Sequence, residues 1–256
     1  MKILYSIENL FLRYGGKIIL KNLSLEIPSG LVSLIGPNGS GKTSLLRVLA
    51  GLEKYSGNIR LKNSEVKNIS RKNFSRTLSF VTSGKNFRPS YSFSVREIIS
   101  MSRLPFRGMF GRMTSHDFEL VEKAAEFLKI YALLDRDIMT LSDGERQLAF
   151  IAAAIAQDTE VILLDEPTAS LDPDKSAMIF SLLKKLSSEG RSIITAVHDI
   201  NTANAYSDFY IAVKNGELIF SGSELNQKIL KNLYGIDFIS YFNNEEKNFM
   251  WSVKIK

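Results

Sequence analysis

The sequence predicts an α/β fold in which helices cover both faces of a mainly parallel β-sheet. Short apolar runs recur along the chain and alternate with helical patterns, at 31–35, 161–164 and 192–197. The first run leads into a glycine-rich turn, and the other two lead directly into acidic residues or a histidine. Because strands that alternate with helices form parallel sheets, we expect functional side chains at the carboxyl ends of these runs.

The elements after the first strand follow from local patterns. A helix is predicted at 42–50, with Gly51 suited to its end. The segment 85–140 interrupts the alternation and is predicted to be an inserted helical region that contains a helix over 118–130. Residues 209–220 predict a hairpin with a tight turn.

The composition excludes several classes of protein. A chain of 256 residues with 45% hydrophobic and 23% charged residues is typical of a globular protein and not of a disordered one. The absence of cysteine excludes disulfides, cysteine-zinc sites and thiol nucleophiles. The longest strongly apolar stretch, 148–156, is far shorter than the about 20 residues of a membrane-spanning helix. Because Glu8 and Arg13 precede any long apolar region, no secretory signal is expected.

The glycine-rich turn matches the phosphate-loop pattern G-x-x-x-x-G-K-[ST] between a predicted strand and a predicted helix. Its glycines allow backbone amides to converge on phosphates at a helix N-terminus. We expect Lys42 to place its charge at the β and γ phosphates and the hydroxyl of Thr43 to ligate Mg²⁺. The residues expected to bind a nucleotide here are Gly36, Pro37, Asn38, Gly39, Ser40, Gly41, Lys42, Thr43 and Ser44.

Two other strand ends carry side chains suited to phosphate chemistry. At the first, Asp165 can hold Mg²⁺ through water and Glu166 can polarise an attacking water. Taken alone, this pair fits a turn cap and a solvated side chain better, and the phosphate loop upstream reverses that preference. At the second, His198 is a candidate because it follows a strand end. A lone histidine is otherwise more often structural than catalytic.

Residues 141–147 open an alanine-rich helix over 148–156. Ser142 with Glu145 three residues later is a capping-box pattern, and Asp143 in the first turn suits the helix dipole. A second interpretation is compatible with the first: this N-terminus presents Ser142 and backbone amides to the γ-phosphate of a nucleotide held by another subunit.

With these motifs in this order, the chain resembles the ATP-binding subunits of ABC transporters over nearly its whole length. The phosphate loop resembles Walker A, residues 141–147 resemble the LSGGQ signature, and residues 161–166 resemble Walker B with its catalytic glutamate. Residues 170–172 resemble the D-loop and His198 resembles the switch histidine. Tyr14 stands where the family has an aromatic residue that stacks on adenine, and a partly buried strand tyrosine is the alternative.

The resemblance implies a P-loop NTPase fold with a RecA-like core, an N-terminal antiparallel β subdomain and an inserted α-helical subdomain. It implies one domain over 1–234, with the core at about 1–84 and 141–234 and the helical subdomain at about 85–140. The tail at 235–256 is expected to pack on the core, with a partner contact as the alternative.

The resemblance also implies an ATPase that uses ATP and Mg²⁺, with two copies that sandwich two ATP molecules between Walker A of one chain and the signature of the other. Glu166 is implied to orient or activate water, His198 to contact the γ-phosphate, and Lys42 to offset developing charge. The other implied ATP-binding residues are Tyr14, Ser142, Gly144, Glu145 and Asp172. The implied Mg²⁺ ligands are Thr43, Asp165 and Ser83.

Parts of the insert resemble a narrower group, the ATPases that energise import of iron-siderophores, haem and cobalamin; the matching residues are 93–97, 103–106, 108–112 and Asp117. In that group the insert contacts cytoplasmic loops of the permease. The resemblance therefore implies integral membrane permease partners, an indirect link to a periplasmic or surface binding protein, and a peripheral place on the cytoplasmic face of the inner membrane. No nucleic-acid partner is expected.

The net charge of +6 is unevenly placed, because 60–76 and 85–112 each hold six basic residues and one acidic residue. Solvated polar faces are the simplest interpretation, and nucleic acid, anionic lipid headgroups and acidic protein loops are alternatives. Neither stretch is a dense basic run of the kind that marks nucleic-acid binding. Contact with a permease gives the second stretch a purpose.

Two positions depart from the family pattern. Ser83 holds the Q-loop position, and a serine is too short to reach Mg²⁺ and the attacking water as glutamine does. Asp143 replaces the first signature glycine and places a carboxylate near a polyphosphate, which weakens closure unless Asp143 points away or Arg146 compensates. Two rival functions, a soluble nucleotide-gated clamp and an exporter subunit, share the catalytic motifs.

Overall fold

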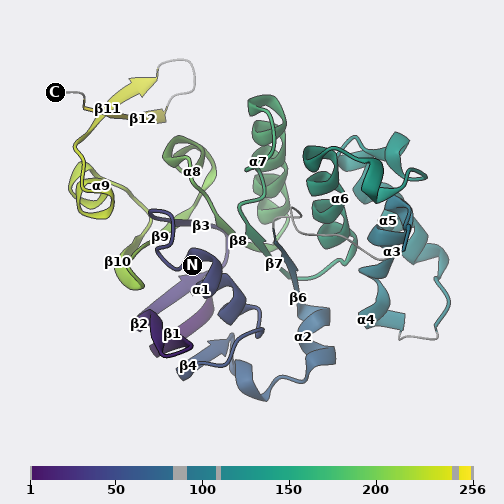
Figure 1. Ribbon diagram of the computed structural model, residues 1–256, viewed down its shortest axis with the longest axis horizontal. Coiled ribbons are helices and arrows are strands. Elements are labelled where there is room, and N and C mark those ends of the chain that lie inside the picture. Colours follow the sequence, from purple (N-terminus) through teal and green to yellow (C-terminus); the bar gives the residue numbers. More distant parts are fainter. Residues whose placement is uncertain (1, 83–90, 108–110, 244–247, 255–256) are drawn as a thin grey trace. The chain divides into compact units, whose positions relative to one another are not determined.

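The computed structural model describes residues 2–82, 91–107, 111–243 and 248–254. The chain divides into two units, Met1–Ile69 with Phe180–Lys256 and Ser70–Ile179. Both units combine strands with helices, which confirms the predicted α/β class (Figure 1). Within the described ranges, no helix is both long enough and apolar enough to cross a membrane.

An antiparallel sheet with strand order β2-β1-β4-β5 opens the first unit. Its strands are β1 (Ile3–Tyr14), β2 (Lys17–Pro28), β4 (Ser56–Leu61) and β5 (Ser64–Glu65), and a short 3₁₀ turn, η1 (Val66–Asn68), follows. Apolar cross-strand pairs such as Leu10 opposite Leu23 are fully buried on one face. The buried hydroxyl of Tyr5 donates a hydrogen bond to the carbonyl of Leu49 at 3.0 Å, which joins the sheet to the first helix. The N-terminal antiparallel subdomain is thereby confirmed.

The first unit also contains the parallel strands that position the phosphate loop. Its elements are β3 (Leu31–Ile35), α1 (Lys42–Leu49), β8 (Ser192–Ala196), α8 (Ile200–Tyr206), β9 (Phe209–Lys214) and β10 (Glu217–Gly222). β3 pairs in parallel with both β8 and β9, and every residue of β3 and β8 is buried, as strands covered on both faces require. β9 and β10 form the predicted hairpin, with positive φ at Asn215 and Gly216.

The C-terminal residues of the first unit form a helix and a hairpin. They are α9 (Gln227–Tyr234), β11 (Phe238–Asn243) and β12 (Asn248–Val253). Phe238 and Trp251 cluster with Leu230 of α9. Asn201 of α8 both donates to and accepts from the backbone of Trp251, at 3.1 and 2.7 Å, so the hairpin is fixed to the helix that follows β8.

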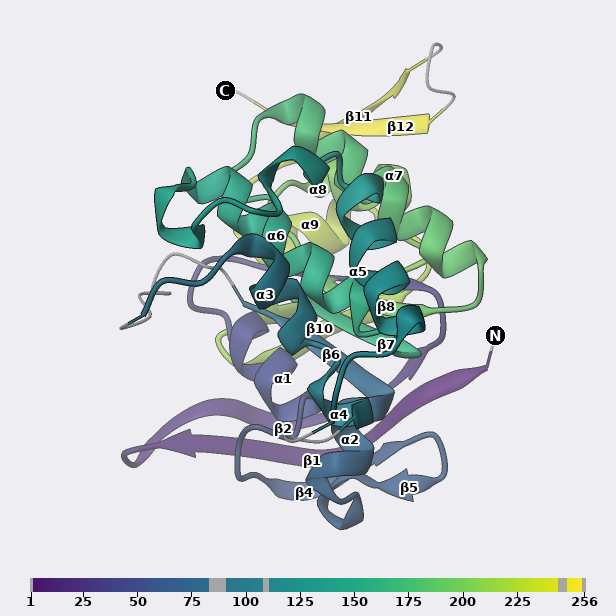
Figure 2. The same ribbon diagram turned by 90° about the vertical axis from the view of Figure 1, so that its right-hand side faces the viewer.

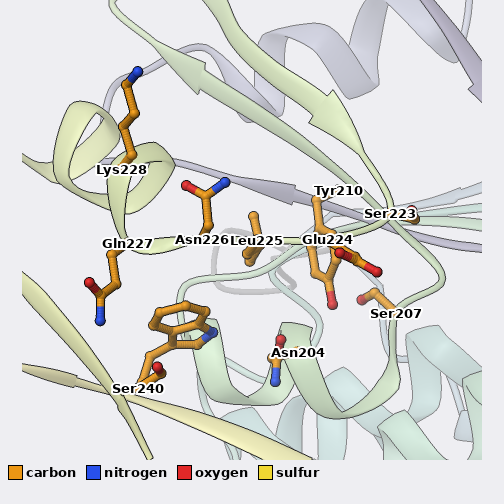
Figure 3. Close-up of a pocket in the computed structure, with 11 residues that line it drawn as sticks. Asn204, Ser207, Tyr210, Ser223, Glu224, Leu225, Asn226, Gln227, Lys228 and Ser240 are labelled. Atoms are coloured by element: carbon orange, nitrogen blue, oxygen red, sulfur yellow. The ribbon is translucent and has the colours of Figure 1, made fainter.

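A pocket of about 890 Å³ lies beside this hairpin, and its lining comes from α8, β9, α9, the hairpin and the segment before α9. Figure 3 shows polar side chains in the lining, with Asn204, Tyr210 and Glu224 among them. Lys228 points away from the other labelled side chains.

The second unit is mainly helical. Its elements are α2 (Arg71–Thr77), β6 (Leu78–Val81), α3 (Val95–Met101), α4 (Leu104–Arg107), α5 (Ser115–Phe127), η3 (Tyr131–Leu133), η4 (Ile138–Thr140), α6 (Asp143–Ala156), β7 (Val161–Asp165) and the first part of α7 (Pro173–Ser188). β6 and β7 pair in parallel. α3 and α5 pack against α6, and the three helices lie side by side in Figure 2.

α5 begins and ends three residues before the predicted helix at 118–130. It begins early because Thr114 and Asp117 form a capping box: the Thr114 hydroxyl accepts from the Asp117 amide at 3.2 Å, and the Asp117 carboxylate accepts from the Thr114 amide at 2.9 Å. It ends early because Lys129 has a φ of +57°, outside the right-handed helical region. The apolar periodicity therefore identified the helix but not its bounds.

Candidate nucleotide-binding site

The loop between β3 and α1 is shaped by close backbone packing. Gly36 has a φ of +150°, and a Cβ on it would lie 2.1 Å from the carbonyl oxygen of Val213 in β9. No other residue fits at that distance, because the clash is with main chain that cannot rotate away. The loop therefore bends directly after the buried strand and brings its amides to the start of α1.

The start of α1 is built to attract an anion. The helix has no side-chain cap and no acidic residue in its first turn, so the positive end of its dipole is not offset locally. Lys42 is buried, and its ammonium donates to the carbonyls of Gly36 and Pro37 at 2.8 and 3.1 Å. Ser40 has a buried hydroxyl that finds no hydrogen-bond partner among the described residues. A phosphate group fits this combination of a held cation, an open helix N-terminus and an unpaired donor.

Tyr14 is the last residue of β1, next to the turn into β2. It is 41% exposed, and its pKa is raised first by burial and then by the neighbouring carboxylate of Glu53. Glu53 in turn forms an ion pair with Arg47 of α1 at 2.6 Å. The structure thus places a half-exposed aromatic ring in the same unit as the phosphate loop. Glu53 connects this ring to Arg47 of α1, the helix that follows the loop.

His198 lies at the same sheet edge as the phosphate loop. β3 and β8 are parallel neighbours, with Leu34 paired to Ala196, so Gly36 and His198 each follow a paired position by two residues. The imidazole is exposed, and Asp199 caps α8 through the amides of Asn201 and Thr202 at 3.1 and 3.0 Å. The histidine therefore stands on a fixed strand end rather than on a loose loop.

The second unit holds the acidic strand end. Asp165 is the last residue of β7 and is only 8% exposed, whereas Glu166 adopts a φ of +50°. Non-glycine residues in this region are strained, and such strain gathers at functional sites. The backbone of Glu166 also accepts a hydrogen bond from the Ala169 amide, which closes the turn after the strand.

The N-terminus of α6 is satisfied by its own side chains. The Ser142 hydroxyl accepts from the Glu145 amide at 3.2 Å, and the Glu145 carboxylate accepts from the Ser142 amide and hydroxyl at 2.9 and 2.8 Å. The backbone and side-chain bonds from Ser142 hold the pKa of Glu145 below its usual range. Asp143 pairs with Arg146 at 3.1 Å and remains mostly exposed. The ion pair with Arg146 is the contact through which the sequence analysis expected Arg146 to compensate for the carboxylate.

Two motifs of the second unit, residues 141–147 and residues 170–172, are in contact. A Cβ on Gly144 would lie 3.1 Å from both the Ser170 carbonyl oxygen and a methyl group of Leu171. Asp172 follows these residues, and its carbonyl accepts from the Ser176 amide in α7. The second unit thus brings Gly144, in the first turn of α6, against the two residues before Asp172.

The sequence analysis did not identify every residue that borders the phosphate loop, and one residue that it named is not described by the structure. Val213 forms the floor of the phosphate loop through its carbonyl, for which no side-chain pattern gives a signal. Burial raises the pKa of Tyr234 in α9 to about 12. Ser83 lies outside the described residues.

These features define a P-loop nucleotide-binding protein. They are the buried Lys42, the uncapped start of α1, and Glu166, whose backbone is strained directly after β7. Comparison with known families narrows the class: residues 20–169 match the family model described as ABC transporter. The chain belongs to the ABC transporter family, and it is the ATP-hydrolysing component, as the sequence motifs predicted.

Relatives and solved structures agree with this family. The chain is 35% identical to the petrobactin import ATP-binding protein of Bacillus subtilis over 89% of this chain and 91% of the relative. It is 33% identical to the ferric enterobactin transport ATP-binding protein of Escherichia coli over 90% and 86%. An inward-facing metal-chelate type ABC transporter superposes with a TM-score of 0.83 at 25% identity, covering 100% of this chain and 98% of that one.

Proposed function

We propose that the chain is the ATP-hydrolysing subunit of an importer for iron-siderophore, haem or cobalamin-type metal chelates. The observation that carries the proposal is its similarity to the petrobactin, iron-hydroxamate and ferric enterobactin import ATPases over nearly their whole length. The insert residues at 103–106 and Asp117 resemble the same group. This similarity favours the importer over the clamp and the exporter.

Nucleotide binding is assigned to the first unit. Lys42 and the amides of the loop bind the β and γ phosphates, and Tyr14 stacks on adenine. Oxygen ligands suit Mg²⁺, so the Thr43 hydroxyl and the Asp165 carboxylate are the side chains that would hold it beside the phosphates. When bound, Mg²⁺ neutralises charge on the β and γ oxygens.

Hydrolysis is assigned to the two strand ends. Glu166 orients the attacking water and accepts its proton, and His198 contacts the γ-phosphate. Because there is little covalent chemistry for the protein to do, the contribution of both residues is position and charge.

The active form is proposed to be a dimer of this chain. One similar ABC cassette has been solved as a dimer in two structures, one of them bound to ADP and phosphate at 26% identity and a TM-score of 0.75. In such a dimer, Ser142 and Gly144 of one copy face the nucleotide held by Lys42 of the other. The permease is contacted through the helical region at about 85–140, which places the chain on the cytoplasmic face of the inner membrane.

Affinity capture tests the proposal. A tagged chain is isolated with ATP from detergent-solubilised native membranes, and its partners are identified by mass spectrometry. We expect a polytopic permease, whose reconstitution with the chain drives ATP-dependent uptake of an iron chelate. A permease that moves cargo outward would assign an exporter, and recovery of soluble proteins alone would assign the clamp.

A further inference from the structure

The C-terminal end of α6 is held by side chains from distant segments of the second unit. Arg103, which lies between α3 and α4, donates through Nη1 to the carbonyls of Ala156 and Gln157 at 3.1 and 2.7 Å. The last carbonyls of a helix have no partners within the helix and form the negative end of its dipole. A guanidinium at this place therefore acts as a charged C-terminal cap.

The same guanidinium is bound to the start of α5. Its Nε lies 2.8 Å from Oδ1 of Asp117, and both side chains are 6% exposed. Burial raises the pKa of Asp117, but the bonds from Thr114 and Arg103 outweigh it and lower the pKa to about 2. The guanidinium also lies 4.2 Å from the ring centroid of Phe106 in α4. One buried side chain thus joins the end of α6, the start of α5 and α4.

The opposite end of α6 carries the signature residues. Arg146 in the first turn of α6 donates to the carbonyl of Leu141 at 2.9 Å, so the residue before the cap is fixed to the helix. The 14 residues of α6 span about 21 Å, and one continuous helix joins the Arg103 contacts at its C-terminal end to Ser142 at its N-terminal end.

We propose that Arg103 is a positioning residue that fixes the signature end of α6 relative to α4 and α5. This inference rests on the proposed role of the signature in binding the nucleotide of a second copy. In a chain with serine at the Q-loop position, the Arg103 contacts give the inserted helical region a direct mechanical connection to the signature. Arg103 itself touches no nucleotide, so its effect is on assembly of the two-copy site and not on binding of nucleotide to α1.

Two variants of the full chain test the inference. Arg103→Lys keeps the positive charge beside Asp117 but loses the planar fork that reaches Asp117, Ala156 and Gln157 together. The double variant Arg103→Met with Asp117→Leu removes both buried charges and keeps an apolar core. For both we expect turnover of ATP to fall about tenfold, since small misplacements of a catalytic group have large effects on rate. The affinity for a fluorescent ATP analogue stays at the wild-type value.

The assembly readout uses the same variants combined with Glu166→Gln, which is expected to bind ATP without hydrolysing it. Sedimentation then reports the ATP concentration at which dimers form, and we expect the Arg103 variants to need about tenfold more ATP. A control is Arg96→Met, because the Arg96 side chain also forms ion pairs with two carboxylates in this unit, Asp135 and Glu122, and no hydrogen bond or ion pair joins that side chain to α6 among the described residues. We expect the control to leave turnover and dimerisation unchanged.

The outcomes separate this inference from the proposed function. Wild-type turnover and dimerisation in a folded Arg103 variant overturn the inference, and so does an equal loss in Arg96→Met. If neither Arg103 variant folds, as judged by thermal unfolding, Arg103 is required for folding and the inference is also overturned. Failure of the proposed function shows instead as unchanged turnover in Lys42→Ala or Glu166→Gln with Arg103 intact.

Discussion

Two helix N-termini are assigned to the nucleotide, and their local chemistry is opposite. α1 begins after Gly41 with no side-chain cap and no acidic residue in its first turn, whereas α6 begins with a complete capping box and two acidic residues. An open, positive N-terminus attracts an anion by itself, and a capped, acidic one does not. We therefore propose that nucleotide affinity resides at α1 and that α6 contributes only to a nucleotide that another copy already holds.

Removal of the charge at α1 should have the largest effect. Lys42→Ala is expected to lower ATP turnover about a thousandfold and to abolish detectable binding of a fluorescent ATP analogue, because the buried ammonium is the charge proposed to bind the β and γ phosphates. Phosphate release and equilibrium fluorescence measure the two effects. Lys228→Ala, on an exposed side chain of α9, serves as the control. Retained binding in Lys42→Ala would show that α1 is not the principal site.

Loss of the Glu166 carboxylate should lower ATP turnover without affecting nucleotide binding. Glu166→Gln is expected to reduce phosphate release about a hundredfold, since a positioned base contributes on that scale, while the affinity of α1 for nucleotide is unchanged. Glu189→Gln, on an exposed surface residue, is the matched control. A parallel loss of affinity in Glu166→Gln would place this carboxylate in nucleotide binding instead.

Neutralising Asp143, the first acidic residue of α6, should make the charge at the N-terminus of α6 more like that at the N-terminus of α1. Asp143→Asn keeps a side chain of the same shape, removes the charge that opposes a polyphosphate, and is expected to lower the ATP concentration for dimerisation about two- to fivefold. The side chain of Asp143 is 64% exposed, so high salt should shrink the difference between variant and wild type. Asp143→Glu, which keeps the charge, should resemble the wild type. A salt-independent gain would mean that shape, and not charge, is responsible.

The capping box of α6 should give a smaller, pH-dependent effect on stability. Ser142→Ala is expected to lower the free energy of unfolding by about 1 kcal/mol at neutral pH. Because folding lowers the pKa of Glu145 below 4.5, its contribution is complete above that pH and is lost as the pH falls through the lower folded value. The difference between variant and wild type in denaturant unfolding should therefore shrink in acid, and the part that remains belongs to the bond from the Glu145 amide to the Ser142 hydroxyl, which does not titrate. A difference of the same size at neutral and acid pH would show that the ionised Glu145 is not involved.

The phosphate loop and the strand ends were predictable because their signals are local. An apolar run followed by a glycine pattern and a lysine specifies strand, loop and helix without reference to the rest of the chain, and β3, α1 and β8 lie where the sequence places them. The capping box at Ser142 was equally predictable from three-residue spacing. The box at Thr114 was missed because it lies before the first apolar residue of α5.

The parts that escaped sequence analysis depend on contacts between distant residues or on main-chain conformation. Arg103 lies 53 residues from its partner Ala156, and nothing near either residue indicates the pairing. The positive φ of Glu166 is set by the turn after β7, and a glutamate gives no sign that it will adopt such a conformation. The sequence patterns therefore indicate which groups are proposed to act, and the structure adds how those groups are held.

The approach of Gly36 to β9 bears on which substitutions this chain tolerates. A Cβ at position 36 would lie 2.1 Å from the carbonyl oxygen of Val213, so only glycine fits there. The side chain of Val213 takes no part in this contact, so its own packing decides which residues position 213 accepts. In a set of random variants, position 36 should be intolerant of every substitution. Position 213 should accept other apolar residues, even though both positions form the same contact.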